Sequence, residues 1–139
     1  MNSVAMLENR IAGAQPAEES RLFADAATLF RTDPDVVRCC EARAFADAAI
    51  RLHRALLPAN GYQLGETAAR RGLASSWRPG DAHALPFEAA TPALALLRAT
   101  AHALAKQHEV EQRALCTSCG GRGWIIARDG SRRLCSHER

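Results

Sequence analysis

A group of sulfur and nitrogen donors near the C-terminus constrains this fold more than any other feature of the chain. Cys116 and Cys119 form a Cys-X-X-Cys pair, which places two sulfurs on one tight turn. Cys135 and His137 follow as a second pair of donors. Zn²⁺ binds four tetrahedral ligands of this kind and deprotonates the thiols that coordinate it. The sequence therefore predicts a zinc site formed by these four side chains.

The chain between the two donor pairs has the pattern of a β-hairpin. Residues 124–128 (Trp-Ile-Ile-Ala-Arg) are strand-like, Asp129-Gly130 is typical of a two-residue turn, and residues 131–135 form the return strand. Such a hairpin returns Cys135 to the neighbourhood of the first pair. The spacing therefore predicts that both donor pairs contribute to one metal site.

Three residues compete to be the fourth ligand. A standard ribbon would carry a second Cys-X-X-Cys pair ending at position 138, where this chain has Glu138. His137 stands one residue earlier and has a side chain long enough to reach the metal, so it is the expected ligand. Glu138 would offer a harder oxygen donor, and His108 on the preceding helix is a more remote alternative.

The rest of the chain is rich in alanine and poor in aromatic residues. Of its 139 residues, 47% are hydrophobic and only 5% are aromatic. This composition favours packed helices over a large sheet. We therefore expect a mainly α fold in two parts: a helical body of residues 1–115 and a zinc-bound β-hairpin of residues 116–139.

Capping residues and apolar periodicity predict four helices in the body. They are expected at residues 4–12, 16–30, 34–57 and 92–115. Residues 58–90 contain too many glycines and prolines for a long element, so short strands at 62–64 and 73–77 would form a small two-strand insert within 61–90. The segment 66–71 also has the composition of a short helix.

Two other patterns in the body have weaker functional readings. Residues 66–77 resemble the first helix and turn of a helix-turn-helix, but Pro79-Gly80 would end the recognition helix after about one turn, too early to fill a major groove. Cys39 and Cys40 are adjacent in an expected helix, so their side chains diverge by about 100° and cannot bind one metal together. Cys40 falls on the apolar stripe and is expected in the core.

Residues 116–124, Cys-Thr-Ser-Cys-Gly-Gly-Arg-Gly-Trp, resemble known zinc-binding repeats. Their first eight positions match the Cys-X-X-Cys-X-Gly-X-Gly repeat of the J-domain co-chaperone cysteine-rich region. That region uses several repeats, whereas this chain has one and lacks the His-Pro-Asp tripeptide of the J-domain, so it is not such a co-chaperone. The segment 113–138 is more similar to small phage and prophage zinc-ribbon proteins, including some lambdoid antitermination proteins.

This resemblance implies metal binding, and it departs from the family pattern where Cys135-Ser-His137 replaces the second Cys-X-X-Cys. Residues 90–96 also resemble a helix start found in small phage proteins of unknown function. Together the two likenesses imply a phage-type origin.

The net positive charge of the chain lies in its last segment. Of 18 basic and 15 acidic residues, residues 116–139 hold five arginines against Asp129 and Glu138, and the remainder of the chain is balanced. On a two-residue-turn register, Trp124, Ile126, Arg128 and Arg133 would share one face of the hairpin. The expected partner-binding residues are Arg122, Trp124, Arg128, Arg132 and Arg133. Such a surface suits phosphates and bases, although charge also keeps a small hairpin soluble.

We therefore expect a non-enzymatic zinc-binding accessory protein of phage or prophage type, whose hairpin binds nucleic acid or a host or phage protein. Two narrower roles stay open: an antitermination-type transcription regulator and an inhibitor of a host defence factor. A zinc- or thiol-dependent enzyme is the alternative of another class, in which a three-cysteine site would hold water and Glu138 would act on it. No nucleophile elbow, phosphate loop or paired-carboxylate motif favours an enzyme or a small-molecule substrate.

The expected location is the cytoplasm. The chain start has no signal-peptide pattern, and no apolar run approaches the roughly 20 residues of a membrane helix. Five cysteines, an odd number, suggest reduced thiols and a metal rather than a set of disulfides. The scattered residues His53, His83 and His102 lie at no catalytic spacing and are expected on the surface or in the core.

Overall fold

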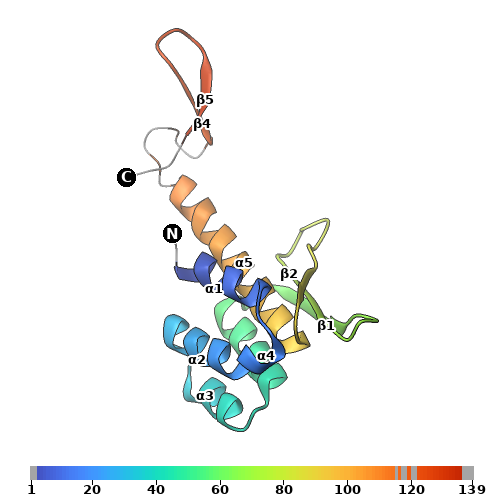
Figure 1. Ribbon diagram of the computed structural model, residues 1–139. Coiled ribbons are helices and arrows are strands. Elements are labelled where there is room, and N and C mark those ends of the chain that lie inside the picture. The colour runs from blue at the N-terminus through green and yellow to red at the C-terminus, as the bar shows by residue number, and fades with distance from the viewer. Residues whose placement is uncertain (1–2, 115, 117–118, 120–121, 136–139) are drawn as a thin grey trace. The chain divides into compact units, whose positions relative to one another are not determined.

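The computed structural model (Figure 1) describes residues 3–114, 116, 119 and 122–135. Within these ranges it contains five α-helices, one 3₁₀ helix and two small antiparallel sheets. The chain divides into two compact units, Met1–Leu104 and Ala105–Arg139. The prediction of a mainly α fold is confirmed in part, because helices form most of the first unit but a three-stranded sheet accompanies them.

The first two predicted helices are present. Helix α1 (Ser3–Ala12) buries Leu7 and Ile11. Pro16 begins a short 3₁₀ helix, η1 (Pro16–Glu18), and α2 (Glu19–Phe30) follows it directly. The apolar residues that α2 buries are Leu22, Phe23 and Ala26, the three- and four-residue spacing expected of one helical face.

The third predicted helix, residues 34–57, is wrong in its length, because the structure has two helices there. Helix α3 (Pro34–Glu41) is followed two residues later by Arg43, whose φ of 58° is left-handed, and α4 (Phe45–Leu56) starts after it. The Arg43 N–H donates to the Cys40 carbonyl (3.0 Å) and the Ala44 N–H to the Cys39 carbonyl (2.8 Å). This pair of bonds is the Schellman closure that usually needs glycine.

The middle segment forms a three-stranded antiparallel sheet in the order β1 (Gly61–Glu66), β2 (Gly72–Trp77) and β3 (Phe87–Ala89). The two expected strands are confirmed, and β3 is an addition. The short helix expected at 66–71 is wrong, because Glu66 ends β1 and residues 67–71 turn the chain toward β2, with Arg70 at φ 61°. Since residues 72–77 are a strand, the helix-turn-helix pattern is excluded as well.

The core of the first unit surrounds the beginning of α5 (Pro92–Ala114). Leu94, Leu96 and Leu97 of this helix are completely buried, at 0% exposure each. The predicted start at Thr91-Pro92 is confirmed, since the Thr91 hydroxyl accepts a hydrogen bond from the Leu94 N–H (3.1 Å). No helix in the described part of the chain is both long and apolar enough to span a membrane.

The predicted C-terminal hairpin is present in the second unit as β4 (Trp124–Ile126) and β5 (Arg132–Leu134). Its turn is one residue longer than expected. The Gly130 N–H donates to the Ala127 carbonyl (2.9 Å), and the Ala127 N–H donates to the Ser131 carbonyl (2.8 Å). Residues 128–130 therefore form the loop, with Gly130 at φ 84°, where a left-handed residue is required.

Candidate metal centre

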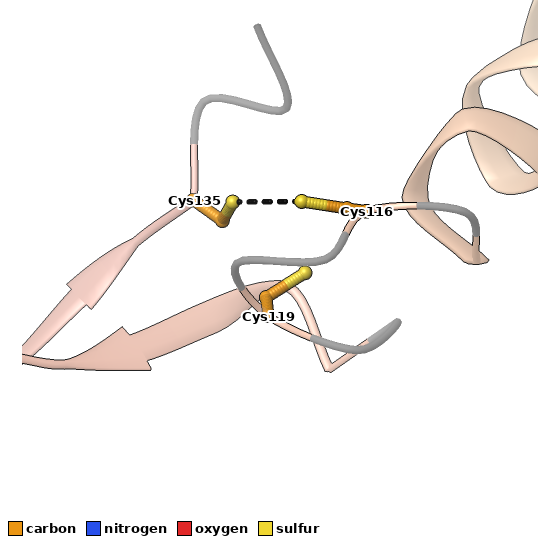
Figure 2. Close-up of side chains that lie close together, drawn as sticks. All are labelled: Cys116, Cys119 and Cys135. Atoms are coloured by element: carbon orange, nitrogen blue, oxygen red, sulfur yellow. Dashed lines mark hydrogen bonds between the residues drawn. The ribbon is translucent and has the colours of Figure 1, made fainter. Parts of the chain in front are cut away.

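Three cysteine sulfurs converge in the second unit. The Sγ atoms of Cys116, Cys119 and Cys135 all lie within 4.8 Å of one another, and those of Cys116 and Cys135 are 3.5 Å apart. Figure 2 shows the three side chains pointing toward one another from three segments of the chain. Zinc–sulfur bonds of about 2.3 Å would place two tetrahedral sulfurs about 3.8 Å apart. The three cysteines are therefore close enough to hold one metal ion.

Hydrogen bonds next to β4 position two of these cysteines. Arg122 donates both its N–H (3.1 Å) and its guanidinium Nε (2.9 Å) to the Cys119 carbonyl, which closes the turn after Cys119. The Cys135 N–H donates to the Gly123 carbonyl (3.1 Å), continuing the β4–β5 pairing toward the sulfur cluster. Cys119 is completely buried, at 0% exposure, whereas Cys116 and Cys135 are half-buried. The register of the hairpin therefore determines where the Cys135 sulfur lies.

Arg113 links the end of α5 to the same turn. Its carbonyl accepts a hydrogen bond from the Cys116 N–H (3.2 Å), and its guanidinium donates to the Arg122 carbonyl (3.3 Å). Gly123 has a φ of 85°, and a Cβ there would lie 1.6 Å from the Arg113 Nη2 atom. The left-handed backbone favours glycine at this position, and the missing side chain leaves room for the mobile end of Arg113.

The structure describes some of the candidate ligands and not others. Cys116, Cys119 and Cys135 are brought together as expected. His108, on α5, is not part of the group of donor atoms that the structure places together. His137, the expected fourth ligand, and Glu138 lie outside the described residues.

The other cysteine pair forms no such group in the described chain. Cys39 and Cys40 lie on α3, where both are half-buried against the hydrophobic core. Burial raises the pKa of the Cys40 thiol, and the neighbouring Cys39 and Glu41 raise it further. A thiol with a raised pKa is a poorer source of the thiolate that binds metal. The core position expected for Cys40 is confirmed in part, because the residue packs against the core but is only half-buried.

The face of the hairpin that carries Trp124 differs from the predicted one. The register pairs Trp124 with Leu134 and Ile126 with Arg132, so these four residues share a face. Arg133 pairs with Ile125 on the opposite face, and placing it beside Trp124 was wrong. The cause is the longer loop, because a shift of one residue exchanges the two faces of a strand.

The arginines predicted to bind a partner divide into two groups in the structure. The guanidinium carbons of Arg122 and Arg132 lie 5.1 and 4.6 Å from the centre of a Trp124 ring. Both distances are within the range of a cation–π contact. Arg128 is exposed in the hairpin loop, and Arg133 is exposed on the other face.

A histidine–serine pair in the first unit has the appearance of a catalytic dyad. His53 Nε2 lies 2.8 Å from the Ser76 hydroxyl, which also accepts a hydrogen bond from the Asn60 amide (3.2 Å). His53 is fully buried, and its Nδ1 atom has no hydrogen-bond partner among the described residues. A histidine that activates serine needs a third group to orient it through that atom. Within the described residues no such group is present, and what the pair provides is a hydrogen bond between α4 and β2.

A groove lies on the surface of α3 and α4. Asp33, Arg51 and Arg54 line it, but each has a partner of its own. The Asp33 carboxylate caps α3, Arg51 lies 3.8 Å from Asp35, and Arg54 donates to the Tyr62 hydroxyl (3.4 Å). The groove therefore presents mostly satisfied polar groups.

Comparison of the chain with models of known protein families, with curated proteins and with solved structures gives no match. The arrangement of the side chains is therefore the basis for assigning a function.

The buried imidazole of His53 makes the stability of the first unit depend on pH. Burial lowers the pKa of His53, and the charge of Arg54 lowers it further. Because the unfolded chain binds this proton more readily, the contribution of His53 to the free energy of unfolding should be constant above about pH 6.5 and fall below it, by at most about 1.4 kcal/mol per pH unit. Urea unfolding followed by helical circular dichroism measures this slope. The series should run from about pH 5 to about pH 8, the range in which histidine side chains change charge.

His53→Gln is the matched variant, because glutamine can still bond Ser76 but does not titrate. We expect it to remove most of the slope below about pH 6.5, whatever its stability at neutral pH. An unchanged slope would assign the acid sensitivity to another group.

Proposed function

We propose that the second unit is a zinc-binding hairpin and that the chain is a non-enzymatic accessory protein that binds nucleic acid. The convergence of three cysteine sulfurs within 4.8 Å beside an arginine-rich hairpin is the observation on which this proposal rests. Thiolates are soft ligands that select zinc over magnesium or calcium. Because they must stay reduced, we also expect the chain to act in a cytoplasm. A phage or prophage origin rests on the resemblance of residues 113–138 alone.

The hairpin itself supports a structural role for the metal. It has only three residue pairs, and Ile126 and Leu134 are 60% and 87% exposed. A two-stranded hairpin with so little buried apolar surface is at best marginally stable in water. Structural zinc sites contribute about 10–16 kcal/mol of binding free energy, which in this case would be folding free energy. The complete burial of Cys119 also favours a closed site over a catalytic one with an open position.

Charge favours nucleic acid over a protein partner. Five arginines and two acidic residues lie in the last segment, and one of those acids serves the turn. The Asp129 carboxylate accepts hydrogen bonds from the Ser131 hydroxyl (2.6 Å) and the Ser131 N–H (2.9 Å), which lower the pKa of Asp129. Arginine forks match phosphate oxygens in geometry as well as in charge. The exposed arginines therefore suit a polyanion.

Metal content and chelation test the zinc site. We expect about one zinc ion per purified chain, and removal by a strong chelator should unfold the hairpin while the helical circular-dichroism signal persists. The reason is that the hydrophobic core cluster lies entirely in the first unit. Cys116→Ser should lose the metal, and Cys39→Ser is the control that should keep it. Stoichiometric metal in Cys116→Ser, or unfolding of the whole chain by chelation, would contradict the proposal.

The fourth ligand is tested by substitution at position 137. Loss of a residue that only supports a metal ligand weakens metal binding by about 10- to 100-fold. Because His137→Ala would remove the ligand itself, we expect it to weaken zinc binding by more than this. His137→Cys should retain binding, since a thiolate can complete the tetrahedron. Competition with a chromophoric chelator measures the affinity, and the spectrum of the cobalt-substituted protein reports the ligand set. His108→Ala and Glu138→Ala are the controls, and a loss confined to either of them would identify a different ligand.

Binding of nucleic acid is tested by its dependence on salt. The zinc-loaded protein should bind a short mixed-sequence oligonucleotide, and the logarithm of its affinity should fall linearly with the logarithm of the salt concentration. The slope counts the phosphates that the arginines neutralise, at about 0.7–0.9 per phosphate. Fluorescence anisotropy across a salt series measures it. An absence of binding at low salt would exclude this function and leave a protein as the partner.

A further inference from the structure

We propose that the ligand of the hairpin is unpaired nucleic acid, bound on the face that carries Trp124. This inference rests on the proposed function and specifies both the surface and the form of its ligand. The Trp124 face consists of Trp124, Ile126, Arg132 and Leu134, and the Arg122 guanidinium lies beside the ring. It is the face that the longer hairpin loop creates, and it differs from the one that a two-residue turn would give.

The Trp124 face exposes apolar groups that the hairpin does not use for folding. Ile126 is 60% exposed and Leu134 is 87% exposed, although both flank a half-buried tryptophan. Apolar groups exposed together and bordered by charge are typical of an interaction surface. The opposite face pairs half-buried Ile125 with exposed Arg133 and has no aromatic residue in the described hairpin. The two faces therefore differ in chemistry while sharing the same strands.

The two guanidinium groups determine which partner suits this face. Those of Arg122 and Arg132 lie within 5.1 and 4.6 Å of a Trp124 ring centre, so positive charge and an aromatic surface occupy the same place. A nucleotide combines a planar base with a phosphate and can use both. The base stacks on the indole or on a guanidinium plane, and the phosphate pairs with the arginines.

The same chemistry favours unpaired over paired nucleotides. In a duplex the bases stack on one another, so the indole and the exposed aliphatic side chains would gain nothing from it. In a single strand each base has a free face, and stacking on an aromatic side chain is worth about a 5- to 150-fold gain in affinity per base. A ladder of three residue pairs also presents too few arginines on one face to bind a duplex through phosphates alone.

Arg132 and Arg133 provide a matched test, because they are adjacent on β5, are both exposed and lie on opposite faces. The probes are a fluorescein-labelled single strand of mixed sequence, in DNA and RNA versions, and the duplex of the DNA version. We expect the zinc-loaded protein to bind the single strands at least about 10-fold more tightly than the duplex. Arg132→Gln should weaken single-strand binding by about 10-fold or more, and Arg133→Gln by no more than about 3-fold.

Trp124→Leu should lower single-strand affinity by about 5- to 150-fold, whereas Trp124→Phe should retain most of it. The zinc content and cobalt spectrum of each variant show whether the metal site is intact, and the Arg132→Gln and Arg133→Gln pair tests the face if the leucine variant fails to bind metal. Equal losses for Arg132→Gln and Arg133→Gln, or tighter binding of the duplex, would overturn this inference while nucleic-acid binding stands. No binding of any probe at low salt would overturn the proposed function itself.

Discussion

The burial of the first half of α5 is the interaction on which the first unit depends. Every residue from Ala93 to Ala101 except Arg98 is buried, and most of the buried residues are alanine or leucine. A helix with so wide an apolar surface must be covered by other elements. The cluster that encloses it draws residues from α1, α2, α4 and the sheet. The alanine-rich composition is therefore the means by which a chain with few aromatic residues fills a core.

Much of this fold was predictable because residues next to the helix starts have side chains that favour a helix N-terminus. Asp33-Pro34 and Thr91-Pro92 each combine a capping oxygen with a proline that fixes the first turn, and both start a helix where expected. The break at Arg43 was not predictable in this way, because it is made by a left-handed arginine and two backbone bonds rather than by glycine. Strand β3 was missed because its three residues are too few to show an alternating pattern, and it is defined by pairing with β2.

The candidate site also has a part that was predictable from sequence and a part that was not. The three cysteines could be identified from sequence because ligand chemistry resides in residue type and spacing, which survive errors in local geometry. The face of the hairpin could not, since Arg132 and Arg133 exchange positions if the loop changes by one residue. Arg113 carries no sequence signal either, because its role is a hydrogen bond from its guanidinium to the Arg122 backbone carbonyl. The type of each residue can be read from the sequence, whereas strand register and the contacts between side chains and backbone require a structure.

The loop of the hairpin has a consequence for how such a chain can evolve. Substitutions at Arg128 or Asp129 would change a side chain at the tip, but a codon lost or gained there would shift the pairing of β5 against β4. That single event would exchange the two faces and also displace Cys135, whose N–H continues the same ladder to Gly123. Relatives of this chain should therefore tolerate many residue types at the tip and very few changes in its length. The length of the loop would therefore identify relatives of this chain better than the residue types in the loop.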